Sequence, residues 1–293
     1  MACCVTLPLS WIHEQPLWLE WFTEGRVHPE LGLDMESLYL PDSWHESMAE
    51  RFREARLACS VHLPFLGIDP ADSDDAAALA ARKHILRGTE LAALYGAIHM
   101  IGHPWYRPRR PGRENDAIDG RWMAMSLALW PRIPSVGNAP LFFENTYETG
   151  PEALAALAVA AGGAKDSGSP AVGVCFDLGH WHAFAGCKRE EELLPWLDAY
   201  AGLPLHLHLH DNDGTDDQHL GLGRGNVPFA ALFALLASRG TDVTATLEPH
   251  DVEAFAASIA WLEKHDAIAR RIGWQKPRME AFPLGEIEKN LAK

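Results

Sequence analysis

The chain has 293 residues, 47% of them hydrophobic, and a formal net charge of -15. This length lies within the range of one α/β barrel, so we expect a single domain. The acidic charge disfavours a broad grip on nucleic acid, because neutralising phosphates requires clustered Lys and Arg. The five cysteines form no C-x-x-C pair. With no signal-type leader and no membrane-length apolar run, we expect a cytoplasmic protein with neither disulfides nor a membrane partner.

Eight short apolar runs predict strands, because each ends in polar, Gly or Pro residues. The predicted strands are residues 3–8, 31–40, 57–63, 95–103, 139–145, 171–178, 203–210 and 242–249. Between them lie stretches long enough for crossover helices, at residues 42–56, 76–94, 116–130, 151–162, 190–201, 228–239 and 252–265. Strand then helix, repeated eight times, is typical of an α/β fold with a single (β/α)8 TIM barrel. A doubly wound sheet is disfavoured, because no G-x-G-x-x-G follows the first run.

Two stretches with few regular signals directly follow predicted strands, and we expect these loops to form much of the specificity surface. They are residues 104–115 and 211–227. The barrel domain is expected to span residues 1–266. Residues 267–293 show no clear periodicity, which indicates a C-terminal tail that wraps the barrel, with a homodimer contact as the alternative.

Six of the predicted strands end on residues of metal-ligand type. Their endings are Ser-Val-His-Leu-Pro-Phe, Gly-His-Pro, Phe-Phe-Glu-Asn-Thr, Phe-Asp-Leu-Gly-His, His-Leu-His-Leu-His-Asp and Leu-Glu-Pro-His. In a barrel the carboxyl ends of the strands face a common axis, so these side chains are expected to converge. Imidazole and carboxylate ligands together suit zinc or manganese better than calcium.

Three carboxylates follow apolar runs in which an unpaired charge would be costly. Glu144 and Asp177 are interpreted as metal ligands, with a buried ion pair as the alternative, and Glu248 is interpreted in the same way.

The histidines are harder to assign individually. His206, His208 and His210 alternate along one strand and therefore point the same way, so we expect one ligand among them while the others fill the barrel. His99 and His103 pose the same choice on another strand. Histidines in predicted helices or connecting loops are expected at the surface: His13, His28, His45, His84 and His265.

Together these residues resemble the xylose isomerase-like TIM-barrel superfamily, which includes sugar phosphate isomerases and epimerases and the endonuclease IV branch, AP endonuclease family 2. The likeness covers roughly residues 57 to 250. Isomerases and epimerases of this family hold their metal with two glutamates, an aspartate and a histidine. The matching positions are Glu144, Glu248, Asp177 and His208.

The endonuclease IV branch has further ligands in H-x-x-Y/F, H-P, D-x-x-H and D-x-H motifs. This sequence has His62, His103, His180, Asp217 and His219 at the matching points. The resemblance therefore implies nine metal ligands and a divalent cofactor, zinc or manganese, with between one and three ions.

The resemblance favours a metal-dependent isomerase or epimerase acting on a sugar or sugar phosphate. Its metal would stabilise an enediolate, and Glu144 and Glu248 would be catalytic, exchanging the proton. The candidate substrate-binding residues are His182, His210, Arg224 and Phe65.

The alternative is a trinuclear zinc phosphodiesterase, in which clustered metals activate water and stabilise the attacking and leaving oxygens. The nine ligands favour this alternative. The acidic charge and residues 41–47, which lack the basic loop expected for DNA contact, favour the isomerase. A small phosphodiester substrate would need neither basic feature. A non-catalytic metal-binding module is disfavoured, because it requires a closed ligand set.

Overall fold

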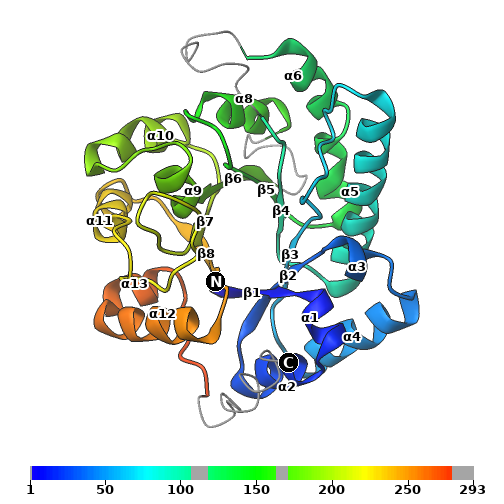
Figure 1. Cartoon of the computed structure of the whole chain (residues 1–293), viewed down its shortest axis with the longest axis horizontal. Coiled ribbons are helices and arrows are strands. Elements are labelled where there is room, and N and C mark those ends of the chain that lie inside the picture. The colour runs from blue at the N-terminus through cyan, green and yellow to red at the C-terminus, as the bar shows by residue number, and fades with distance from the viewer. Residues whose placement is uncertain (1, 107–117, 163–170, 279–293) are drawn as a thin grey trace.

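The computed structural model describes residues 2–106, 118–162 and 171–278, which form a closed barrel of parallel strands surrounded by helices (Figure 1). Each strand pairs with its neighbours in sequence, and the first strand closes the barrel against the last. The predicted (β/α)8 barrel is therefore confirmed. The strands are β1 (Cys4–Pro8), β2 (His28–Gly32), β3 (Ser60–His62), β4 (Met100–Gly102), β5 (Leu141–Glu144), β6 (Val172–Asp177), β7 (Leu205–Leu209) and β8 (Val243–Leu247).

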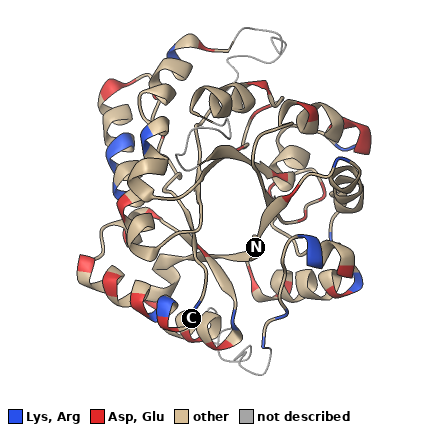
Figure 2. Cartoon of the chain, turned by 180° about the vertical axis from the view of Figure 1, so that it is seen from behind, with Lys and Arg blue, Asp and Glu red and all other residues tan. Residues whose placement is uncertain are grey.

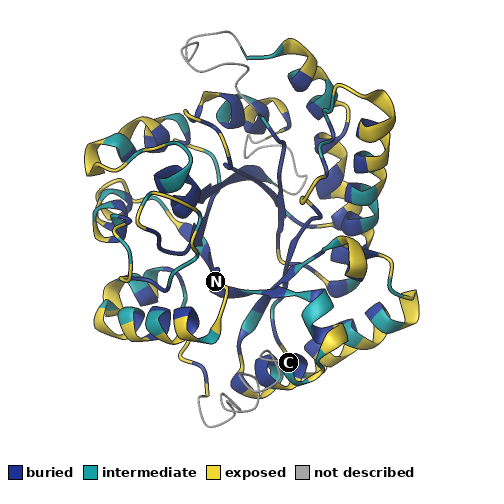
Figure 3. Cartoon of the chain, viewed as in Figure 1, coloured by how far each residue is buried: buried dark blue, intermediate teal, exposed yellow. Residues whose placement is uncertain are grey.

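The helices form an outer ring around the strands, and their exposed faces lie at the periphery of Figure 3. They are α1 (Leu9–Glu14), α2 (Leu17–Gly25), α3 (Met35–Leu38), α4 (Asp42–Glu54), α5 (Asp75–Tyr95), α6 (Gly120–Leu127), α7 (Ile133–Gly137), α8 (Glu152–Ala160), α9 (Leu178–Ala183), α10 (Leu193–Ala199), α11 (Phe229–Ser238), α12 (Val252–Lys264) and α13 (Asp266–Arg271), with 3-10 turns η1 (Trp130–Arg132) and η2 (Glu190–Glu192). None of the described helices is long and apolar enough to cross a membrane.

The second strand lies earlier in the chain than predicted. It spans His28–Gly32, whereas the prediction of residues 31–40 overlaps it at two positions only. The region after it bends into α3, because the Asp34 side chain caps that helix by accepting the Ser37 N–H at 2.7 Å. Helices α1 and α2 were also not predicted from the sequence. The error matters for function, because it left Glu30 outside the predicted strand.

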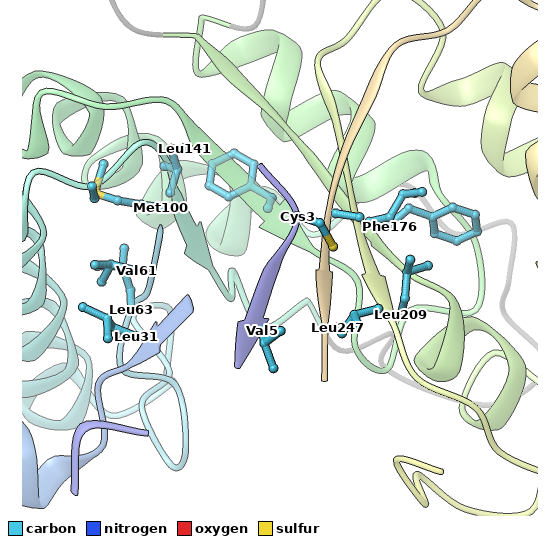
Figure 4. Packing of buried hydrophobic residues seen from close by; sticks show 14 of the residues in the cluster. Cys3, Val5, Leu31, Val61, Leu63, Met100, Leu141, Phe176, Leu209 and Leu247 are labelled. Carbon is cyan, nitrogen blue, oxygen red and sulfur yellow. The ribbon is translucent and has the colours of Figure 1, made fainter. Parts of the chain in front are cut away.

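The strands alternate between two faces, and the outward faces build the main core. Val5, Leu31, Val61, Leu141 and Leu247 belong to one apolar cluster that also includes residues of the helices; Figure 4 shows such side chains on neighbouring strands. Residues two apart in a strand share a face, so the positions between these point into the barrel.

The interior of the barrel is mostly polar, in contrast to the bulky branched side chains that usually fill it. Among the described residues, Ile101, Phe142 and Cys175 form a small apolar cluster of their own there. Most of the other inward positions hold imidazoles, carboxylates and hydroxyls, all of which need partners when buried. Such a polar interior indicates a functional site rather than a layer of packed hydrophobic side chains.

The described part of the predicted tail packs on the barrel. Helix α13 begins at Asp266, Trp274 packs against the main core, and the Cys3 N–H donates to the Gly273 carbonyl at 3.4 Å. Residues 279–293 of the predicted tail and residues 107–117 of the predicted specificity loop lie outside the described residues. The wrapping role and the domain boundary stay predictions.

Candidate metal centre

Glu144, the last residue of β5, lies at the centre of a group of buried imidazoles. Its Oε2 lies 3.1 Å from His62 Nε2, 2.9 Å from His103 Nε2 and 3.3 Å from His208 Nδ1. Its Oε1 lies 3.2 Å from His180 Nδ1. The four imidazoles come from four other strands or from the segments that follow them. The side chains at the carboxyl ends of these strands therefore converge, as the sequence predicts.

The first group of candidate ligands comprises His62, His103 and Glu144. The two imidazoles approach each other to 3.2 Å between their Nε2 atoms, and both face the same carboxylate oxygen. All three side chains are at most 7% exposed. Two imidazole nitrogens and one carboxylate oxygen therefore point to a common position.

The second group surrounds His208 in β7. Its Nδ1 lies 3.3 Å from Glu144 Oε2, 3.3 Å from Glu248 Oε1 and 3.8 Å from Asp177 Oδ2. This nitrogen is buried and makes no hydrogen bond of good geometry. An unpartnered nitrogen among three carboxylates is the arrangement that a divalent cation would complete.

The third group lies at Asp217, in the loop after β7. Asp217 Oδ2 lies 3.2 Å from both His180 Nε2 and His219 Nε2, and its Oδ1 lies 3.7 Å from His210 Nε2. His210 also contacts Asp177 Oδ1 at 3.2 Å. The structure thus brings together all nine predicted metal ligands, and places His210 beside them.

Three histidines of these groups are oriented in the same way. In His62, His180 and His219, Nδ1 donates to a backbone carbonyl, so that Nε2 faces a carboxylate. The accepting carbonyls are those of Leu63, Asn145 and Glu248, at 3.0, 2.9 and 2.9 Å. Metal-ligating histidines typically donate their second N–H in this way, which fixes the tautomer and the ring orientation. The residues therefore fit divalent metal ions.

Neighbouring imidazoles lower the pKa values of two buried carboxylates of the centre. Burial raises the pKa of Glu144, but the charges of His103 and His208 hold it well below its usual value. Burial also acts on Asp217, yet hydrogen bonds from His180 and His219 lower its pKa. Glu144 and Asp217 thus stay ionised and need positive partners.

The D-x-x-H segment after β6 is built around a helix start. Asp177 accepts the His180 N–H at 2.6 Å and so caps the short helix α9. Gly179 lies between them because a Cβ there would come within 1.8 Å of the His210 ring. Sequence spacing therefore places Asp177 and His180 in neighbouring groups.

Hydrogen bonds of Asp211 hold the loop that contains Asp217 and His219 in place. Asp211 accepts the N–H groups of Gly223 and Val227 at 2.9 and 3.0 Å, and its backbone forms a bridge with Leu220. His219 itself has a φ of 47°, which is strained for a non-glycine residue. The surrounding bonds hold this conformation and so direct His219 toward Asp217.

A cavity of about 350 Å³ opens over the three groups. Phe65 forms part of its wall and stacks on His103, with ring centroids 4.5 Å apart. Trp11 lines it from the side of β1. The cavity therefore joins a polar floor to an aromatic wall, which suits a small substrate with both polar and apolar parts.

Two other candidate substrate-binding residues, His182 and Arg224, are not among the residues that line this cavity. Both ring nitrogens of His182 contact protein, one the Cys187 carbonyl and the other Asn226 Oδ1. Arg224 is exposed and lines a neighbouring pocket beside His219. Their roles stay predictions.

Sequence reasoning missed three residues of this region. Glu30 is fully buried beneath the centre, with its Oε1 3.0 Å from His208 Nε2. His250 stacks on His219 at 3.6 Å between centroids, and Thr6 lies 3.4 Å from Glu248 Oε1. The interior position of Glu30 follows from the alternation of β2, a signal that the misplaced strand concealed.

His45 is another departure, since it was predicted at the surface. It is fully buried between α4 and α5, where its Nδ1 lies 3.0 Å from the Tyr95 hydroxyl and its Nε2 3.0 Å from the Ser37 carbonyl. A buried imidazole is tolerated in a core when both of its nitrogens have hydrogen-bond partners. The burial of His45 could not be predicted because polar residues flank it in the sequence of α4.

Comparison with known proteins identifies relatives along most of the chain. An uncharacterised protein of Methanocaldococcus jannaschii, MJ1311, is 25% identical over 226 residues, which cover 75% of this chain and 74% of its own. The structure of a Thermus thermophilus protein, TTHB071, described as soaked with ZnCl2, is 27% identical and covers 92% of this chain and 99% of its own, with a TM-score of 0.71.

A D-tagatose 3-epimerase-like protein has the same fold, with 21% identity, a TM-score of 0.63 and coverage of 82% of this chain and 89% of its own. At this identity the likeness shows the fold alone. The model of one family matches residues 27–265, which include all nine candidate ligands. The chain belongs to the xylose isomerase-like TIM-barrel family.

Proposed function

We propose that the protein is a multinuclear metal-dependent phosphoesterase that acts on a small phosphate ester or diester. The observation that carries this proposal is the position of Glu144. Both of its oxygens face imidazoles, and those imidazoles belong to separate groups. A carboxylate in that position would be able to bridge cations held by these groups, and its oxygens would then bind metal rather than exchange a proton with a sugar.

The nine residues would hold up to three divalent cations. His62 and His103 would share Glu144 with the group of Asp177, His208 and Glu248. The remaining ligands are His180, Asp217 and His219. Clustered divalent ions would supply Lewis-acid stabilisation of the attacking and leaving oxygens of a phosphoester.

The chain's own residues would contribute orientation and exclusion of water. The backbone carbonyls that accept from His62, His180 and His219 fix the rings before substrate arrives. Phe65 covers His103 with its ring and removes that imidazole from solvent. Preorganised groups of this kind need little rearrangement during reaction.

The charge distribution favours a small substrate. In the view of Figure 2, Lys and Arg positions are interspersed with Asp and Glu positions on the outer helices. Binding along a nucleic acid backbone uses clustered Lys and Arg, and the chain has a net charge of -15. The aromatic wall of Phe65 and Trp11 beside the centre suits the organic part of a small ester.

The second candidate is a sugar or sugar-phosphate isomerase or epimerase, and Glu248 favours it. This residue lines the cavity, and burial beside Glu144 raises its pKa, as a group that takes and returns a proton requires. In that reaction the group of Glu144, Asp177, His208 and Glu248 would hold a single metal.

The phosphoesterase requires the first and third groups of candidate ligands, whereas the isomerase requires only the group around His208. We would therefore compare wild type with the double variant His62→Ala, His219→Ala. Metal content would be measured on protein purified without chelators, and activity on aryl phosphate mono- and diesters and on ketoses. For the phosphoesterase we expect about three ions in wild type and a loss of phosphoesterase activity of at least roughly 100-fold in the double variant.

The control is His13→Ala, which removes an exposed imidazole outside the centre. It should retain the metal content and activity of wild type. A double variant that kept one ion and full ketose epimerisation would instead establish the isomerase. Full phosphoesterase activity in the double variant would contradict the trinuclear centre.

A further inference from the structure

A chain of polar contacts runs through the barrel interior to the proposed metal centre. It begins at Thr244 in β8, whose hydroxyl lies 2.6 Å from His206 Nδ1. His206 Nε2 lies 3.1 Å from the Thr246 hydroxyl, which donates to Glu30 Oε2 at 2.8 Å. The chain ends where Glu30 Oε1 lies 3.0 Å from His208 Nε2.

The direction of the chain follows from the number of protons available. The Thr246 hydroxyl has one proton and donates it to Glu30, since a buried carboxylate only accepts. Thr246 must therefore accept from His206, which requires a proton on Nε2 of that ring. His206 Nδ1 then accepts from Thr244. Each contact points toward Glu30.

Glu30 is held rigidly at the end of this chain. Its Oε2 accepts from Ser60 at 3.0 Å as well as from Thr246, so that oxygen is satisfied. Its Oε1 and His208 Nε2 are both buried and lie 3.0 Å apart, and among the described residues neither atom makes a hydrogen bond of good geometry with any group. His99 Nε2 lies 3.7 Å from Glu30, which is too far for a hydrogen bond. Glu30 Oε1 therefore faces His208 alone.

The opposite side of the His208 ring faces the centre, where its Nδ1 lies 3.3 Å from both Glu144 and Glu248. An imidazole that carries its proton on Nε2 keeps the lone pair of Nδ1 free. We propose that Glu30 is a positioning residue, which holds His208 with its proton on Nε2 and the Nδ1 lone pair turned toward the metal. The inference rests on the proposed metal centre.

The barrel offers matched variants for a test. Glu30→Gln removes the charged acceptor, and Thr246→Val removes a hydroxyl that fixes Glu30. Thr244→Val removes a hydroxyl from the same face of the same strand, but one that contacts His206 and not Glu30. Thr246→Ser retains the hydroxyl and serves as the conservative variant.

The affinity for cobalt(II) and zinc would be measured on the full chain by competition with a chromophoric chelator, together with the visible spectrum of the bound cobalt. We expect Glu30→Gln to weaken binding about 10- to 100-fold, as losses of such supporting partners typically do. Thr246→Val should weaken binding several-fold, whereas Thr246→Ser and Thr244→Val should stay within about twofold of wild type.

The unfolding free energy of the metal-free protein separates positioning from structure. If Glu30 only supported the fold, Glu30→Gln would lower the stability of the metal-free chain and leave its metal affinity and cobalt spectrum unchanged, which would overturn the inference. Equal weakening by Thr244→Val and Thr246→Val would overturn it as well. If wild type bound no metal, both this inference and the proposed function would fall.

Discussion

The surroundings of Glu144 bear on the choice between the two candidate reactions. A glutamate that works as a proton carrier needs an oxygen open to the substrate. Here both oxygens lie within 3.3 Å of imidazole nitrogens. This geometry supports the proposed phosphoesterase, whereas the family resemblance and the acidic charge favoured the isomerase.

Glu144→Gln tests the bridging role directly. The amide of glutamine carries no charge, and its N–H group cannot bind a cation as the carboxylate oxygen would. We therefore expect the variant to retain at most one ion per chain. Elemental analysis after dialysis would measure the metal content. Glu148→Gln is the matched control, since Glu148 is buried four residues later and burial raises its pKa to about 7. It should keep the full metal content. Equal metal content in both variants would contradict the bridge.

His45 makes a prediction about pH that is independent of the metal centre. Burial lowers its pKa, and this outweighs the hydrogen bond to the Ser37 carbonyl, which raises it, so the pKa of the folded ring lies below its usual value. The unfolded chain takes up the proton as the pH falls below about 6.5. The contribution of His45 to stability is therefore complete above that pH and decreases below it.

The measurement compares urea unfolding of wild type and His45→Gln between pH 8 and pH 5. Glutamine can retain a contact with Tyr95 or Ser37 without titrating. We expect the advantage of wild type to shrink as the pH falls. An advantage that grew on acidification would show that His45 is charged in the folded chain.

At the scale of elements, the helix start after β6 combines a cap with a ligand pair. Gly179→Ala would drive a Cβ into the His210 ring, which contacts Asp177. We expect a loss of about 1 to 3 kcal/mol of unfolding free energy, typical of overpacking, together with reduced metal affinity. Gly120→Ala is the control, because a Cβ there meets nothing within 4 Å. If both variants unfolded alike, close packing at Gly179 would not be the reason for the glycine.

Strand periodicity and ligand type predicted the barrel and the convergence of seven of the nine residues, whereas Asp217 and His219 were predicted only from the family resemblance. Glu144 and Asp177 could be found because each ends an uninterrupted apolar run. Glu30 could not, because His-Pro-Glu-Leu-Gly has no apolar run before it and the Asp34 cap lies two residues beyond the strand. The pairing of each imidazole with its carbonyl depends on backbone geometry that no spacing encodes.

The whole molecule holds an unusual number of carboxylates inside one barrel. Glu30, Glu144, Asp177 and Glu248 are each at most 8% exposed. Their mutual repulsion must be offset in the folded chain, by protonated imidazoles or by cations. Metal binding should therefore be coupled to stability.

We expect removal of metal with a chelator to lower the thermal midpoint of unfolding, and zinc at about 100 times its dissociation constant to restore roughly 2.7 kcal/mol. Scanning calorimetry at fixed pH would measure both. Glu144→Gln should show a smaller response, because fewer ions bind. A midpoint that zinc does not move in wild type would argue against a site in the folded state.

Few residue pairs close the barrel. Strand β1 pairs with β8 at two positions, whereas it pairs with β2 at five. Glu248 follows β8 and contacts Thr6 of β1, so the last candidate ligand arrives at the junction of the chain's first and last strands. During synthesis, an emerging chain has His62, His103 and Glu144 long before it has Glu248. If the centre binds metal as proposed, it can therefore be completed only after the residues up to Glu248 have been synthesised.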